Sequence, residues 1–97
     1  MAVWLRHMTR TLRWHRMFHE RITPEEWHAK MERAAHGKCP AVAPLVRELI
    51  RLGGPMTPKD AADAVAEDVG APLDDVRVNL VLAVELKTLT VADGVLI

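Results

Sequence analysis

The sequence is poor in the features that mark disulfide-rich, secreted or membrane-spanning proteins. Its 97 residues contain one cysteine, no tyrosine, one phenylalanine and three tryptophans. Cys39 alone cannot form an internal disulfide, which is typical of proteins in a reducing cytoplasm. No segment has the roughly 18–20 consecutive apolar residues of a transmembrane helix, and arginines interrupt the N-terminal region where a secretory signal would be apolar. We therefore expect a cytoplasmic protein with no membrane association.

The sequence also lacks net charge, since 13 Lys and Arg residues balance 13 Asp and Glu residues. An overall basic bias, which would favour nucleic-acid binding, is therefore absent. The charges are nevertheless separated: residues 1–40 carry a net charge of +4, and residues 41–97 a net charge of −4. This asymmetry predicts a basic N-terminal helical arm over residues 1–40 and a second domain over residues 41–97. Alternatively, the two parts are electrostatic complements that dock on each other.

Two helices are expected in the basic arm. The first ends near Thr23-Pro24, because a residue that precedes proline is disfavoured in a helix. Thr23 then caps a second helix that runs to His36, with a glutamate three residues after the cap. At about 100° per residue, one stripe of the first helix is apolar and predicts its buried face. This stripe consists of Trp4, Leu5, Met8, Leu12, His15, Phe18, His19 and Ile22.

The opposite side of the first helix is basic, and three uses of it remain open. Its arginines include Arg6, Arg10, Arg13 and Arg16. A row of arginines about one turn apart can contact phosphates of a nucleic acid. A basic amphipathic helix can also lie on an anionic membrane surface. In the third alternative, the arginines are a solvated face, and the apolar side packs on the domain or on a second copy.

The histidines and the cysteine form two pairs with spacings found in zinc sites. His15 and His19 are four residues apart on one helix face, and His36 and Cys39 follow at the end of the second helix. Together they would offer four ligands for a tetrahedral zinc ion. The order of the second pair is unusual, however, and buried histidines more often bond to a carbonyl or a carboxylate. We therefore expect no metal and no cofactor, with these four residues as the candidates if a metal is bound.

The second part of the sequence predicts three helices followed by a hairpin. Pro44–Leu52 is the first helix, with Leu45, Leu49 and Leu52 expected to point inward. Thr57-Pro58 starts an alanine-rich second helix that ends at Gly70, and a third helix begins near Leu73. Two short β-prone runs surround Asp93-Gly94, a strong hairpin signal. The predicted fold is therefore mainly α with a small C-terminal β-hairpin.

This order of elements resembles the winged helix-turn-helix family over residues 42–97. The residues that carry the resemblance are Ala66-x3-Gly70 at the turn, Val76-x3-Leu80 in the third helix, Glu85 to Leu89 after it, and Asp93-Gly94 at the tip of the wing. The resemblance implies a winged helix preceded by a helical arm of two helices. It also implies a DNA-binding class in which the third helix enters the major groove and the wing contacts the backbone.

The third helix departs from this family on the face that would read DNA. If Val76, Leu80, Ala83 and Val84 point inward, the outward face shows Asp74, Asp75, Val78, Val81, Leu82 and Glu85. Carboxylates would repel phosphates, and exposed aliphatic side chains need an apolar partner. Only Arg77, Asn79 and Lys87 suit DNA contacts, and they lie toward the edges of this face. The six outward residues therefore predict a protein interface.

These features leave two functions open. The first is a non-catalytic winged-helix regulatory protein that uses the third helix to form a homodimer or to bind another protein. The alternative is a small DNA-binding transcriptional regulator whose basic N-terminal helix contacts the phosphates of double-stranded DNA. An enzyme with a small-molecule substrate is not expected, because the sequence has no nucleophile–base pair and no glycine-rich phosphate loop.

Overall fold

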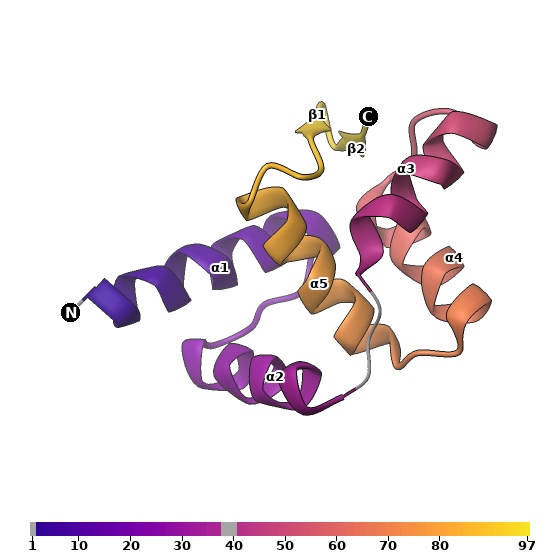
Figure 1. Cartoon of the computed structure of the whole chain (residues 1–97). Helices are drawn as coiled ribbons and strands as arrows, with labels where there is room; N and C mark the ends of the chain where they lie inside the picture. The colour runs from indigo at the N-terminus through magenta and orange to yellow at the C-terminus, as the bar shows by residue number, and fades with distance from the viewer. Residues whose placement is uncertain (1, 38–40) are drawn as a thin grey trace.

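A computed structural model describes residues 2–37 and 41–97 and contains five helices and one β-hairpin (Figure 1). The prediction of a mainly helical chain with a small C-terminal hairpin is therefore confirmed. The elements are α1 (Ala2–Phe18), α2 (Pro24–His36), α3 (Val42–Gly53), α4 (Pro58–Val69), α5 (Leu73–Glu85), β1 (Val91–Ala92) and β2 (Val95–Leu96).

Local signals place the ends of the helices. The Thr23 and Thr57 side chains cap α2 and α4 by accepting hydrogen bonds from the backbone N–H of the third residue of each helix, at 3.2 and 3.1 Å. Gly70 ends α4 in the left-handed conformation, with φ of 70°. Helix α1 ends at Phe18, earlier than the sequence predicts, because His19 also adopts the left-handed conformation with φ of 55°. The chain therefore turns toward α2 before Thr23 is reached.

The hairpin is fixed to the loop that precedes α4. Val91 pairs with Leu96 and Ala92 with Val95, and the turn residues Asp93 and Gly94 both have positive φ, as a tight two-residue hairpin requires. The Leu96 N–H donates to the Met56 carbonyl at 2.7 Å, and the Met56 N–H donates to the Leu96 carbonyl at 3.3 Å. Met56, in the loop between α3 and α4, therefore pairs with the hairpin through a single-residue β-bridge to Leu96.

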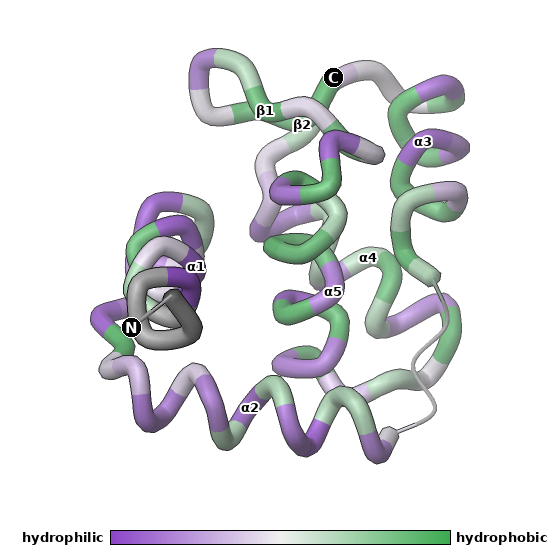
Figure 2. Tube along the Cα trace, turned by 60° about the vertical axis from the view of Figure 1, so that its left-hand side comes forward, coloured by the Kyte–Doolittle hydropathy of each residue, from purple (hydrophilic) through white to green (hydrophobic). Residues whose placement is uncertain are grey.

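Helix α5 lies at the centre of the molecule and packs against all four other helices (Figure 2). In this view α1 lies on one side of α5, α3 and α4 lie on the other side, and α2 runs below. Trp14 of α1 and Trp27 of α2 are fully buried, with an edge-to-face contact of 5.4 Å between ring centroids. They belong to the same hydrophobic cluster as Val46, Val65 and Leu80. One core thus includes residues from both parts of the sequence.

Two helices bury a different face from the one that periodicity predicts. Among the described side chains of α1, the buried ones are Thr11, Trp14, Met17 and Phe18. Met8, Leu12 and His15 of the predicted stripe are exposed, as is His19 just after the helix, and the side chains of Trp4 and Leu5 lie outside the described ones. In α3, Val42 and Val46 are buried, while Leu45 and Leu49 are only half-buried and Leu52 is exposed. Phe18 of the predicted stripe is buried as expected, but Trp14 decides the orientation of the rest of α1, because burying an indole removes more apolar surface from water than burying Leu12 would.

Candidate functional site

The predicted protein-binding face of α5 lies inside the chain. Val78 and Val81 are 1% and 0% exposed, and Leu82 is half-buried. The expectation that these side chains face solvent is therefore wrong. Helix α5 is apolar on nearly every side, so after α3 and α4 cover one side, α1 and α2 cover the other. In the described part of the chain, this face is an internal contact.

The two aspartates at the start of α5 bind basic residues of α2. The Lys30 ammonium lies 2.6 Å from the Asp74 carboxylate, and the Arg33 guanidinium lies 3.1 Å from the same carboxylate. Arg33 also lies 3.2 Å from the Asp75 carboxylate, which is 3% exposed. Burial of the Asp74 carboxyl raises its pKa, but hydrogen bonds from Lys30 and Arg33 outweigh this effect and hold the pKa below its ordinary value. These carboxylates hold α2 on α5 and are not free for a partner.

Three of the residues predicted to contact DNA are also used within the chain. The Arg10 guanidinium donates to the Glu85 carboxylate at 2.9 Å, and both side chains are largely buried. Arg77 donates to Glu20 at 2.6 Å, and its guanidinium lies over the Phe18 ring, 5.1 Å from the centroid. Asn79 donates to the Asp75 backbone carbonyl at 2.9 Å. Arg77 and Asn79 therefore cannot reach base edges in this arrangement.

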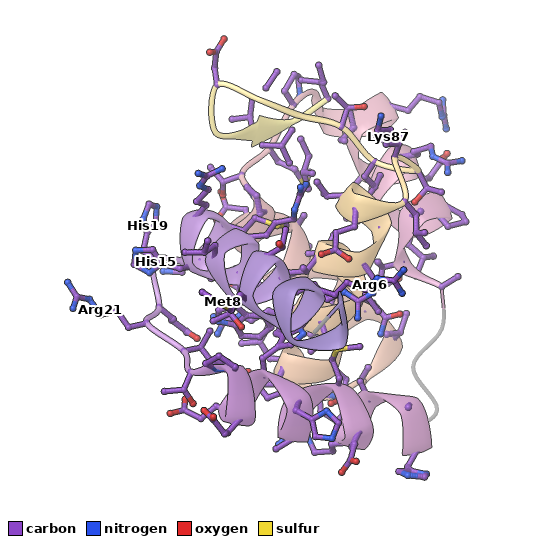
Figure 3. All side chains as sticks on the ribbon, turned by 90° about the vertical axis from the view of Figure 1, so that its left-hand side faces the viewer. Arg6, Met8, His15, His19, Arg21 and Lys87 are labelled. Carbon is purple, nitrogen blue, oxygen red and sulfur yellow. The ribbon has the colours of Figure 1, made fainter. Side chains whose placement is uncertain are left out.

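Three other arginines of α1 remain available to a ligand. Arg6 and Arg16 are exposed and Arg13 is half-buried, and none of them forms an ion pair with the residues that the structure describes. We call Arg6, Arg13 and Arg16 the α1 arginine surface. Arg6 and Arg13 line a shallow groove between α1 and the end of α5, together with the paired Arg10 and Glu85. Lys87 is exposed just beyond α5, and in Figure 3 it lies on the same side of the molecule as Arg6.

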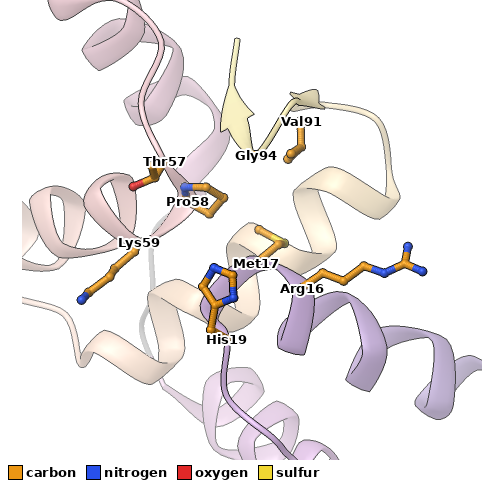
Figure 4. A pocket seen from close by; sticks show the side chains of 8 residues that line it. All are labelled: Arg16, Met17, His19, Thr57, Pro58, Lys59, Val91 and Gly94. Atoms are coloured by element: carbon orange, nitrogen blue, oxygen red, sulfur yellow. The ribbon is translucent and has the colours of Figure 1, made fainter.

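The α1 arginine surface continues to the N-terminus of α4. An open cavity of about 440 Å³ lies at this point and is lined by Arg16, His19 and Lys59. Thr57, the N-cap of α4, and Gly94 of the hairpin turn also line it. Figure 4 shows these side chains around the cavity, with Arg16 on α1 and Lys59 on the first turn of α4. Cationic side chains therefore extend from Arg6 along α1 to the start of α4.

The histidines do not assemble a metal site in the part of the chain that is described. His15 Nδ1 lies 3.0 Å from the Glu20 carbonyl, and His19 and His36 are exposed on different elements. The fourth candidate ligand, Cys39, lies outside the described residues. Within residues 2–37 and 41–97, no three His, Cys, Asp or Glu side chains are grouped as a metal ion would require. The same residues include no helix that is both long and apolar enough to cross a bilayer.

Comparisons with known proteins leave the function open. The chain matches no protein-family model, no curated protein and no solved structure. Its function therefore has to be inferred from the side chains and their geometry.

The residues that sequence reasoning missed are Trp14, Glu20, Lys30 and Arg33, which hold α1 and α2 against α5. The opposite net charges of the two parts were the signal that pointed to these contacts, because they favour docking of one part on the other.

Proposed function

We propose that this protein is a small, non-catalytic binding protein whose α1 arginine surface contacts the phosphate backbone of double-stranded DNA. The observation that carries this proposal is the difference between two groups of cations. Arg10, Lys30, Arg33 and Arg77 are neutralised by carboxylates of the same chain. Arg6, Arg13 and Arg16 have no such partner among the described residues, so they can neutralise phosphates without breaking an internal contact.

The scaffold supports this class of function. Helices α3, α4 and α5 are followed by the hairpin, and Met56 pairs with Leu96, which is the order of elements in a winged helix. In that family the third helix reads bases, but here α1 and α2 cover α5. We therefore propose that binding depends on phosphate contacts and is largely independent of base sequence.

The spacing of the arginines fits a phosphate backbone. Arg6 and Arg16 are ten residues apart on α1, which corresponds to about 15 Å along the helix axis. One DNA strand carries about four phosphates over that distance, at about 3.4 Å each. Three guanidinium groups on one helix can thus follow a short stretch of one strand. Lys59 shares a cavity with Arg16, and Lys87 lies on the same side of the molecule as Arg6, so both lysines would extend the contact.

Binding of another protein through α5, the first function that the sequence suggested, would require α1 and α2 to leave the core. This movement would expose Trp14 and Trp27, both fully buried, and would break the ion pairs of Arg33 and Arg10. Each buried tryptophan accounts for several kcal/mol of stability, on the order of 3–5 when truncated to alanine. Phosphate binding needs no such rearrangement and is therefore the function that we favour.

The test is duplex affinity measured against salt concentration. Wild-type protein should bind a generic duplex with an affinity that falls steeply with salt, with a slope of up to about −3 in log–log form for three neutralised phosphates. The double substitution Arg6→Glu with Arg13→Glu should abolish binding at physiological salt. The matched control, Arg21→Glu with Arg51→Glu, changes the net charge equally on other surfaces and should retain most of the affinity. Equal losses for the two doubles, or no salt-dependent binding by wild type, would contradict the proposal.

A further inference from the structure

Two apolar strips, one on α1 and one on α3, are left partly exposed to solvent. On α1, Met8 and Leu12 are exposed, and 57% of Leu12 is accessible to solvent. On α3, Leu52 is 71% exposed, and Leu45 and Leu49 are half-buried next to it. Both strips have the helical periodicity of a buried face. A single copy of the chain leaves both partly uncovered.

The strip on α3 forms the floor of a groove with an acidic rim. We call this the α3–α4 groove, an open depression of about 640 Å³ whose walls are α3 and α4. Its lining includes the apolar side chains of Leu45, Leu49, Leu52 and Val65. It also includes the carboxylates of Glu48, Glu67 and Asp68, which we call the acidic rim, and Glu48 is paired with Arg51. Glu67 and Asp68 form no ion pair with any residue in the described ranges. An occupant of this groove should therefore be apolar in its centre and basic at its flanks.

Helix α1 presents that combination. We call Met8 and Leu12 the α1 strip. Arg16 flanks this strip on the same helix, and Arg21 lines a shallow depression together with Leu12. Helix α1 contains no Asp or Glu, so no carboxylate on it would oppose the acidic rim. Figure 3 shows Met8 on the other side of α1 from Arg6. The α1 strip is thus separate from the part of the α1 arginine surface formed by Arg6 and Arg13.

We propose that the α1 strip of one copy docks into the α3–α4 groove of a second copy, so that the protein associates head to tail. Leu12 would enter the leucine-lined floor, and Arg16 and Arg21 would face Glu67 and Asp68. The contact is between two different surfaces, which makes it heterologous. This proposal does not rest on phosphate binding, because Met8, Leu12 and the α3–α4 groove take no part in the phosphate contact; Arg16 is the one residue that the two proposals share.

The arrangement of the helices makes the association open-ended. Figure 2 shows α1 on one side of α5 and α3 and α4 on the other. In the head-to-tail arrangement that we propose, one strip meets one groove, so each bound pair keeps one free strip and one free groove. Association should continue beyond the dimer as the protein concentration rises, and it should weaken with salt because the flanking contacts are between exposed charges.

The test measures mass in solution by sedimentation, from micromolar to millimolar protein at low salt. The weight-average mass of wild type should rise past twice the 10.9 kDa of one chain without a plateau. Leu12→Asp and Leu52→Asp should each weaken association by about tenfold or more, since each removes one of the two surfaces. Leu86→Asp is the matched control, because Leu86 is 75% exposed and lies in neither surface. This variant should behave like wild type.

Mixing the two variants gives the sharpest result. The Leu12→Asp chain keeps an intact groove and the Leu52→Asp chain keeps an intact strip, so an equimolar mixture should form one-to-one dimers and stop there. Reversing the rim with Glu67→Lys and Asp68→Lys should cause the same loss as Leu52→Asp without changing an apolar contact. Circular dichroism of each variant checks that it is folded.

Several results would overturn the proposal. Wild type that stays monomeric at all concentrations, or that stops at two copies, contradicts an open head-to-tail contact. Association that survives both Leu52→Asp and the rim reversal shows that the groove is not used. A mixture of Leu12→Asp and Leu52→Asp chains that stays monomeric shows that the two surfaces are not partners.

Discussion

Replacement of Trp14 by alanine should destabilise the whole chain. Trp14 is fully buried, contacts the Phe18 and Trp27 rings edge to face at 5.1 and 5.4 Å, and donates from Nε1 to Glu20 at 3.2 Å. Truncation of a buried tryptophan to alanine costs about 3–5 kcal/mol, because apolar contacts are lost and a cavity remains. Domains of this size have a total free energy of unfolding of about 5–15 kcal/mol, so the variant loses a large part of its stability.

The assay for Trp14→Ala is urea and thermal unfolding followed by far-UV circular dichroism and by the fluorescence of the remaining tryptophans. At about 4–8 °C per kcal/mol, a loss of 3 kcal/mol lowers Tm by at least about 12 °C. Leu12→Ala, on the same helix but mostly exposed, should change the free energy of unfolding by less than about 1 kcal/mol. Both probes should report one transition, because Trp14 belongs to the same core as α3, α4 and α5. Similar costs for the two variants, or a separate early transition of α1, would show that Trp14 is not part of a single shared core.

Two further predictions concern α5. Val78→Asp should unfold the protein or cost more than about 4 kcal/mol of unfolding free energy, because Val78 is 1% exposed and the change replaces a buried valine with a carboxylate. Leu86→Asp, at an exposed position, should be nearly neutral. A folded Val78→Asp variant with an unchanged urea midpoint would be inconsistent with the packing of α5. The lowered pKa of Asp74 stabilises the fold at pH values above the pKa of an unfolded aspartate, about 4, and this contribution disappears as the pH falls through the lower folded pKa. The difference in unfolding free energy between wild type and Asp74→Asn should therefore be largest near neutral pH and vanish in acid, and a difference that is independent of pH would argue against the ion pairs with Lys30 and Arg33.

Local structure could be predicted well from the sequence. Thr23 and Thr57 cap helices as their hydroxyls and following prolines indicate, and Asp93-Gly94 forms the hairpin turn. These features depend on residues within a few positions of each other, so the sequence contains the information that determines them. The end of α1 is the exception. The left-handed conformation of His19 has no comparable signal, because glycine and asparagine are the residues that usually adopt it.

The burial of whole faces could not be predicted in the same way. Periodicity correctly placed Val76 and Leu80 of α5 in the core, but it treated the opposite face as exposed because it considered one packing partner only. Whether Val78 and Val81 meet solvent depends on where α1 and α2 lie, and these helices are more than 40 residues away in sequence. The same limitation affects the candidate site. Arg10 and Arg13 look equivalent in the sequence, yet of the two only Arg10 forms an ion pair with Glu85.

Exposed charges of opposite sign lie on different helices of this molecule, whose net charge is zero. Unpaired guanidinium groups lie along α1, and the exposed carboxylates of Asp63, Glu67 and Asp68 lie on α4, which Figure 2 shows on the other side of α5 from α1. In the electric field of a polyanion, such a molecule rotates before contact, so that α1 faces the polyanion and α4 faces away from it. Most encounters would then begin in the productive orientation, although net attraction at long range is weak. Added salt should reduce the rate of encounter, because at about 0.1 M it screens the aligning field beyond about 10 Å from the surface.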